Sequence, residues 1–331
     1  MLARLAENLF WAGRYLVRAE DSARMVDVTW HMLLESPSTE TSRAWEDLLE
    51  VLQQGEGFEQ WAGGDDDLMA VRPDDVVRWL VSERSNGGSV LASVGMAREN
   101  ARSVRELLSS EVWEAVNDLH LTLHRRDLPH ELGDQPYDLF RTVKLHCQTV
   151  MGVALETMPR DEAFRFLLLG RALERAEMTC RLVSVRWEDL LADRAFQLAP
   201  TLLRSVGSLE AFRKRHRASA NPIDVLQLLV LDRDLPRSVL FQLEAAGAQL
   251  ARVGRAGRGP EGPSARRLGR AHAALRYRDA AELVELGVED VLERMQVEVR
   301  EVTEAIGEEF FTHAPTGALH AVGAVGGEGA S

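Results

Sequence analysis

The chain has 331 residues, of which 45% are hydrophobic and 6% aromatic, and its formal net charge is −13 at pH 7. This acidic balance argues against wholesale binding to a nucleic acid backbone and disfavours binding to anionic membranes, since both need a basic surface. The two cysteines do not make a disulfide framework, and no apolar run approaches the roughly 18 residues that a membrane span needs.

The first predicted element is a long helix over residues 4–35. It begins in charged sequence without an apolar signal core, so we expect a cytoplasmic protein. Apolar or small residues recur at alternating steps of four and three, which is typical of helices packed along their length. These residues are Leu5, Leu9, Ala12, Leu16, Ala19, Ala23, Val26, Trp30 and Leu33. Gly13 lies beside this seam, and because a helical glycine costs about 1 kcal/mol against alanine, we expect another backbone to approach it.

The remaining segments also favour helix, because Leu, Ala, Glu and Arg dominate the composition and no segment has a convincing strand pattern. Segments 53–67 and 125–136 are predicted to be loops. A second long helix is predicted from about residue 162 to 191. The other predicted helices are 42–52, 73–81, 90–123, 137–157, 199–206, 208–216, 222–230, 239–252, 265–276, 279–285 and 288–312.

The two long helices share a sequence pattern. The residues G-R-x-L-x-R-A-E-x-x-x-R occur at 13–24 and again at 170–181, an offset of 157 (170 minus 13). Weaker matches follow at offsets that fall to 149, as between Ser89 and Ser238. We interpret this as an internal duplication with a unit of about 150 residues, near the ordinary size of a domain.

The predicted fold class is therefore all-α, a helical bundle of two duplicated units whose long helices pack about a pseudo-two-fold axis. The predicted boundaries are 1–158 for the first repeat and 159–312 for the second. Together the repeats form one composite domain. Residues 313–331 are a tail of small residues that we expect to be disordered.

Two Glu–Arg pairs, Glu20/Arg24 and Glu177/Arg181, flank the seam at the favourable four-residue spacing. If the helices meet about a two-fold axis, the two carboxylates could approach each other. Close carboxylates share a proton, accept arginine or hold a hard cation, which makes Glu20 and Glu177 candidate catalytic residues. The alternative is a half-buried structural ion pair that fixes the register of the helices.

Further arginines form a second stripe at four-residue spacing, namely Arg14/Arg18 and Arg171/Arg175. They are candidates for clamping an anion or an acidic partner, and the alternative is a solvated helix face.

The polar triplet Arg98-Glu99-Asn100 is present in the first unit only. The matching positions in the second unit are Gly247, Ala248 and Gln249. A triplet needed only for architecture is expected in both units, so these three residues are candidates for a binding surface. An ordinary exposed helix face is the alternative.

Signatures of cofactor chemistry are missing from the sequence. There is no G-x-x-x-x-G-K-[ST] and no G-x-S-x-G. His120 and His124 have metal-ligand spacing but no evident third ligand. We therefore predict no cofactor and no dedicated metal site.

Four ordered motifs resemble those of the bacterial alpha-E domain family. They cover about residues 1 to 312 and are Glu7–Glu20, Arg98–Arg102 with the following Ser110–Asn117, Leu169–Glu177, and Pro236–Val239. The chain departs from the family pattern at Val17, where an acid is usual, and at Ala172, where an aromatic residue is usual. Glu174 keeps the acid in the second unit.

This resemblance implies an all-helical cytoplasmic protein that works with a circularly permuted ATP-grasp ligase and a transglutaminase-like peptidase. It implies a helical accessory, or a partner that presents the substrate of an amide ligase, in peptide synthesis or modification. The alternative is an enzyme of amide chemistry that uses the paired Glu and Arg residues, with or without a bound metal. An independent enzymatic activity is the less favoured hypothesis.

Overall fold

The computed structural model describes residues 1–35, 41–63, 72–134, 136–192, 195–216, 221–253 and 262–312. Every regular element in these ranges is a helix, which confirms the predicted all-α class. Within the same ranges, no helix combines the length and the apolar character needed to cross a bilayer. The predicted tail, residues 313–331, lies outside the described residues.

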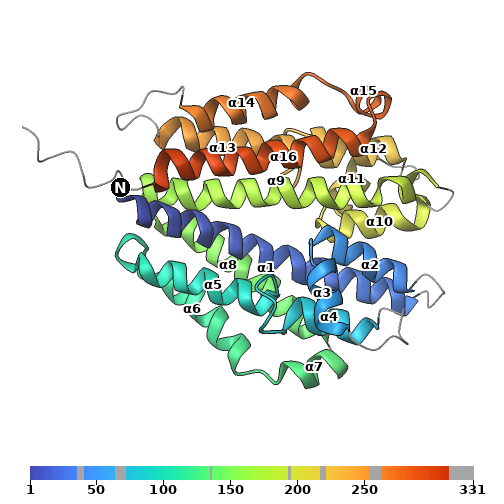
Figure 1. Cartoon of the computed structure of the whole chain (residues 1–331), viewed down its shortest axis with the longest axis horizontal. Coiled ribbons are helices and arrows are strands. Elements are labelled where there is room, and N and C mark those ends of the chain that lie inside the picture. The colour runs from blue at the N-terminus through green and yellow to red at the C-terminus, as the bar shows by residue number, and fades with distance from the viewer. Residues whose placement is uncertain are drawn as a thin grey trace, which may run out of the picture.

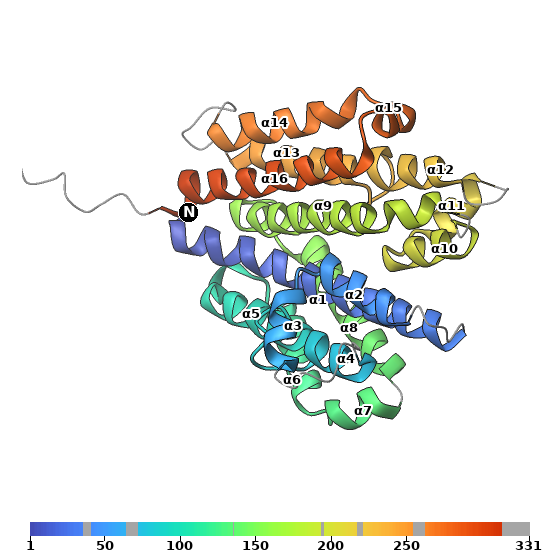
Figure 2. The same cartoon turned by 45° about the vertical axis from the view of Figure 1, so that its right-hand side comes forward.

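Two long helices, α1 (Ala3–Glu35) and α9 (Glu162–Leu191), lie side by side through the middle of the molecule (Figure 1). A group of helices packs on the α1 side, comprising α5 (Val90–Ser103), η1 (Arg105–Leu107), α6 (Ser110–His124), α7 (Leu128–Asp134) and α8 (Pro136–Thr157). A second group packs on the α9 side, comprising α13 (Val239–Val253), α14 (Pro263–Arg276), α15 (Ala280–Glu285), α16 (Val288–Ile306) and η4 (Gly307–Phe311). The turned view in Figure 2 keeps the two long helices between these groups.

Shorter helices pack at the end of the α1–α9 pair where both long helices have their C-termini (Figure 1). Those that follow α1 are α2 (Thr41–Val51), α3 (Gly55–Ala62) and α4 (Pro73–Val81). Those that follow α9 are α10 (Ala195–Ser205), α11 (Leu209–Arg215), α12 (Pro222–Leu226) and the π-helical turn η2 (Gln227–Leu231). The same order of short helices thus follows each long helix, in agreement with the sequence matches between the two halves.

The predicted single helix over 90–123 is wrong, because the chain breaks between α5 and α6. Val104 leaves the helical region, with φ −128° and ψ 24°. Ser109 then caps α6, since its hydroxyl accepts a hydrogen bond from the amide of Val112 at 3.2 Å. A serine cap satisfies one of the free amides at a helix start, and it stabilises the new helix in place of the continuous one.

Two predicted loops also contain helices. In α3, Phe58 and Trp61 pack on Trp79 of α4, with the two indole rings 5.5 Å apart. In α7, Leu128 and Leu132 are buried. Apolar side chains in these short segments find tertiary partners, and their burial outweighs the loop-forming composition around them.

The predicted seam forms the core between α1 and α9. Its members in α1 include Leu9, Ala19 and Val26, each with 0% of its surface exposed. The α9 residues at the matching positions, such as Leu173 and Val183, are equally buried. Burial of this apolar stripe along both helices is the main force that holds them together.

Glycines occupy the point where the two helices come closest. A Cβ added to Gly13 would lie 2.1 Å from the carbonyl oxygen of Leu167, and one added to Gly170 would lie 1.9 Å from that of Phe10. Both distances are far below van der Waals contact, so only glycine allows this approach. The prediction that another backbone approaches Gly13 is confirmed.

The contact is also reciprocal. Gly170 follows Gly13 by the same offset as Leu167 follows Phe10, and each glycine faces the other helix's carbonyl. Such a contact is what a two-fold relation between the units would produce. The internal duplication and the repeat boundaries 1–158 and 159–312 stay predictions.

We predict that Gly13→Ala and Gly170→Ala each lower the free energy of unfolding by more than about 2 kcal/mol, because the new methyl group collides with backbone of the opposite helix. Gly95→Ala and Gly152→Ala are the controls, since no described atom outside the local helix backbone lies within 4 Å of a Cβ at either position. These should raise stability by about 0.5–1 kcal/mol through helix propensity. Urea unfolding measures all four, and equal effects at all four would contradict the close contact.

Candidate functional site

Charged side chains surround the glycine contact and lie in two clusters. The Glu20 cluster comprises Glu20, Asp21, Arg24, Gln148, Arg171, Arg175 and Arg237. The Glu177 cluster comprises Arg14, Arg18, Glu174, Glu177 and Arg181. The three glutamate side chains are almost fully buried, with exposed fractions of 3% for Glu20, 0% for Glu174 and 6% for Glu177.

Glu20 accepts four hydrogen bonds. Its Oε2 accepts from Arg175 Nη2 at 2.7 Å. Its Oε1 accepts from Arg237 Nη2 at 2.6 Å, Arg24 Nη2 at 3.0 Å and Gln148 Nε2 at 3.0 Å. Burial by itself would raise the pKa of Glu20, but Arg237 and Arg175 outweigh burial and hold that pKa far below its usual value. Glu20 is therefore ionised near neutral pH, and both of its oxygens accept hydrogen bonds from neighbouring side chains.

Arg237 joins this cluster from the turn before α13. Its Nη1 also donates to Asp21 at 2.5 Å, so one guanidinium bridges two adjacent carboxylates. Burial would lower the pKa of Arg237, but Asp21 and Glu20 raise it above its usual value. Arg171 behaves differently, because burial and the nearby Arg175 and Arg237 lower its pKa to about 10. Among the residues that the structure describes, the Nε of Arg171 has no hydrogen-bond partner.

In the Glu177 cluster the acids lie on α9 and accept hydrogen bonds from arginines of α1, the reverse of the Arg175–Glu20 pair. Arg14 of α1 donates through Nε to Glu174 at 2.5 Å and through Nη2 to Glu177 at 2.6 Å. Arg18 Nε donates to Glu174 at 2.8 Å, and Arg181 Nη2 lies 3.5 Å from Glu177. Burial would raise the pKa of Glu174, but Arg14 and Arg18 lower it to about 2.

These contacts bear on the interpretations left open by the sequence. Arg14 and Arg175 are 5% and 6% exposed, so the solvated-face interpretation is wrong for both. Over the described ranges, no arginine pairs with both Glu20 and Glu177. Each acid is held by its own set of arginines, which is the arrangement of a structural ion pair. Within those ranges there is also no group of three or more His, Cys, Asp or Glu side chains placed to hold a metal.

The triplet Arg98-Glu99-Asn100 lies apart from both clusters, on α5. Arg98 Nε donates to Asn117 Oδ1 of α6 at 2.8 Å, and its guanidinium lies 5.7 Å from the ring centre of Trp113. Glu99 is 48% exposed. We call the set Arg98, Glu99, Asn100, Arg102, Arg105, Trp113 and Asn117 the α5–α6 patch. It joins two segments of the second sequence motif into one surface.

Sequence reasoning missed the site roles of Asp21, Gln148, Glu174 and Arg237. The missed signal for Arg237 is a charge imbalance, because adjacent acids at 20 and 21 require more than one cation once they are buried. Gln148 gave no such signal. Its role depends on the side of α1 against which α8 packs.

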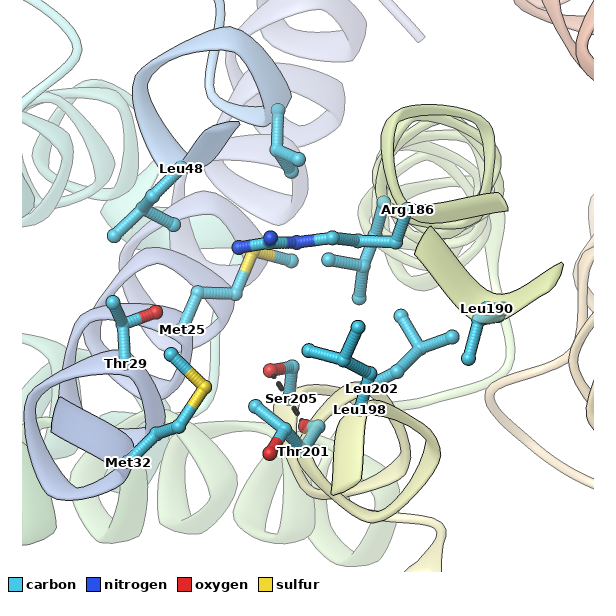
Figure 3. A pocket seen from close by; sticks show the side chains of 12 residues that line it. Met25, Thr29, Met32, Leu48, Arg186, Leu190, Leu198, Thr201, Leu202 and Ser205 are labelled. Carbon is cyan, nitrogen blue, oxygen red and sulfur yellow. Dashed lines mark hydrogen bonds between the residues drawn. The ribbon is translucent and has the colours of Figure 1, made fainter. Parts of the chain in front are cut away.

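A cavity between α1, α2, α9 and α10 is lined mainly by apolar side chains such as Met25, Leu190 and Leu198 (Figure 3). Its volume is about 20 Å³, enough for about one water molecule. Arg186 reaches along one wall and pairs with Asp47. The size and lining indicate a packing defect of the core, and no substrate group fits there.

We predict that Glu20→Gln lowers the free energy of unfolding by about 3 kcal/mol or more, because it leaves three arginines buried beside a neutral group. Glu99→Gln is the matched control. Since Glu99 is 48% exposed, the change there should stay within about 0.5 kcal/mol. Urea unfolding of both variants checks this, and an unaffected Glu20→Gln would contradict the structural role of the pair.

A second prediction concerns pH. The folded pKa of Glu174 is lowered from 4.5 to about 2, so its ionised form stabilises the fold above about pH 4.5 and this stabilisation is lost as the pH falls towards 2. In Glu174→Gln, the fall in unfolding free energy between about pH 5 and pH 3 should become shallower. Exposed Glu285 provides the control, since Glu285→Gln should keep the wild-type slope; an unchanged slope in Glu174→Gln would contradict the assignment.

Comparison with known proteins gives few further leads. An uncharacterised protein of Mycobacterium bovis is 28% identical over 262 residues, which cover 75% of this chain and 29% of that protein. Two uncharacterised proteins of Mycobacterium tuberculosis match over the same length at 28% and 27% identity. The chain thus spans only 29% of the length of these relatives. No solved structure matches the chain.

A family model matches residues 1–311. It is the Alpha-E model, which describes a predicted alpha-helical domain with a conserved ER motif. Glu174 and Arg175 provide an adjacent Glu-Arg pair at the helix crossing, where Glu174 belongs to the Glu177 cluster and Arg175 to the Glu20 cluster. The match extends over both long helices and the groups of helices on either side of them, and the chain therefore belongs to the Alpha-E family.

Proposed function

We propose that this chain is a helical accessory of an amide-forming enzyme, which it supports or to which it presents a substrate. The proposal rests on the hydrogen bonds that the Glu20 carboxylate already accepts from its neighbours. This carboxylate accepts bonds from three arginines and one amide, and its low pKa keeps it from acting as a general acid near neutral pH. The acids and arginines of this cluster hold α1 to α9, and the activity belongs to a partner.

The α5–α6 patch is the proposed contact with that partner. Arginine and tryptophan are enriched at protein interfaces, and here Arg98 and Arg105 both lie close to Trp113, at 5.7 and 5.3 Å from its ring centre. The patch lies on the α1 side of the molecule (Figure 1). The Arg98-Glu99-Asn100 triplet is absent from the matching helix of the second half, so we expect the first half alone to make this contact.

The identity of the partner comes from the family resemblance. It suggests a circularly permuted ATP-grasp ligase, with a transglutaminase-like peptidase as a second associate. The relatives extend well beyond the matched region, which supports a domain that works beside other modules. We expect this pairing in the cytoplasm.

A second candidate is an enzyme of amide chemistry that uses Glu177. Unlike Glu20, Glu177 lines a polar cavity, together with Arg18 and Arg181. Glu177→Gln discriminates between the two candidates. Loss of activity without a change in melting temperature favours chemistry, whereas a large fall in melting temperature favours architecture.

The accessory proposal predicts that the chain captures an amide ligase from its native host and that adding the chain changes the rate of amide ligation. Glu99→Arg, in the patch, should reduce capture by about tenfold or more, because it reverses a charge at the contact. Glu285→Arg is the control, since Glu285 is exposed and lies on α15 in the other half. Failure to capture a ligase, together with an unchanged ligation rate, would refute the proposal.

A further inference from the structure

The two clusters differ at the positions that correspond to Asp21 and Arg237, which form the bridging ion pair of the Glu20 cluster. At the offset of 157 residues, the counterpart of Asp21 is Met178. At the offset of 149 that relates the following segments, the counterpart of Arg237 is Gly88. The Glu177 cluster therefore has a thioether where the other cluster has a carboxylate, and no side chain where it has a guanidinium.

A cavity lies at that place. Its volume is about 160 Å³, well above the roughly 10–15 Å³ that one water molecule requires. The residues that line it are Arg18, Ser22, Leu52, Gln53, Gln54, Gly88, Glu177, Met178 and Arg181. Most of them present polar groups, in contrast to the apolar cavity of Figure 3.

Glycine at position 88 keeps this space open. A Cβ there would lie 2.5 Å from Nε2 of Gln54 and 3.2 Å from Oδ1 of Asn86. Any side chain at this position would push the Gln54 amide from its place in the wall. The observed position of the Gln54 amide therefore requires glycine at residue 88.

The cavity has an excess of positive charge. The Glu177 cluster contains three arginines (Arg14, Arg18 and Arg181) against two carboxylates (Glu174 and Glu177). Arg14 is fully engaged, since it donates to Glu174, to Glu177 and to the hydroxyl of Thr303. The unbalanced charge therefore falls on Arg18 and Arg181, the two arginines that line the cavity.

Arg181 is the least satisfied of these cations. Its side chain is only 8% exposed, yet Nη2 lies 3.5 Å from Glu177 and Nη1 lies 3.3 Å from the carbonyl oxygen of Val51. Its Nε has no hydrogen-bond partner within the described part of the chain. A buried guanidinium with long contacts and a free donor is unfavourable unless a further acceptor completes its shell.

We propose that the cavity beside Arg18 and Arg181 is a binding site for an oxyanion, supplied by the carboxylate of a peptide or by free phosphate. Planar guanidinium groups recognise both chemistries through paired N–H donors, and the amides of Gln53 and Gln54 add further donors. A cationic ligand does not fit the site, because Glu177 is already bound by Arg14 and the remaining wall is positive.

Solvent can reach the site. Arg18 is 27% exposed, and Gln53 is exposed at the turn that follows α2. A carboxylate on a flexible peptide end, or a small free ion, enters through such an opening. None of the residues that line the cavity belongs to the α5–α6 patch, so the proposed ligand and the proposed partner contact different residues.

Isothermal titration of the full chain with glutarate and, separately, with inorganic phosphate at constant ionic strength tests the proposal. Met178→Asp adds a carboxylate at the position that matches Asp21, and Gln54→Glu adds one on the half-buried wall. Each should weaken binding by about tenfold or more, since the new charge competes for the arginines. Met178→Leu is the control, because it keeps the volume without adding charge and should bind as the wild type does.

The titration results distinguish a carboxylate ligand from free phosphate. Saturable binding of glutarate alone assigns the site to carboxylates, binding of phosphate alone assigns it to phosphate, and binding of both assigns it to oxyanions in general. Absence of saturable binding of either probe to the wild type overturns the proposal. Equal binding by the wild type and the folded Gln54→Glu variant overturns it as well, and this variant remains informative where Met178→Asp fails to fold.

Discussion

The close approach of α1 and α9 at Gly13 and Gly170 is the constraint on which the rest of the structure depends. Because each glycine faces a carbonyl oxygen of the other helix, the two backbones lie nearer than side chains usually allow. The arginines and glutamates beside the glycines are thereby brought within bonding distance across the contact. Arg14 reaches Glu177 from one side and Arg175 reaches Glu20 from the other.

Buried charges then set the character of the contact. A carboxylate placed between helices is tolerated only if cations surround it, and Glu20 and Glu174 meet this condition with arginines from both helices or from the turn before α13. Such pairs add little net stability compared with an apolar contact, but they strongly penalise any other register of the helices. The apolar seam drives association, and the ion pairs select one arrangement.

The two clusters share this design and diverge in one detail that bears on function. Arg237 completes the Glu20 cluster from within the chain, whereas the Glu177 cluster has Gly88 and Met178 at the corresponding positions and keeps an open polar cavity. The first cluster is thus filled by its own side chains. The second leaves two arginines on the wall of the proposed oxyanion site, while the α5–α6 patch is the proposed contact with a partner protein.

The sequence by itself determined the helical class, the two long helices, the seam and the closeness of the backbones at Gly13, because these depend on periodicity and on the special geometry of glycine. It did not determine the break at Ser109 or the helices α3 and α7, since local composition there competes with burial against distant residues. Nor did it determine that Arg175 pairs with Glu20 whereas Arg171, one turn earlier on the same stripe, forms no ion pair with a carboxylate of the described residues. Only the tertiary structure decides such pairing, because the rotation of each helix and the neighbours brought by other segments fix which charges share the low-dielectric interior.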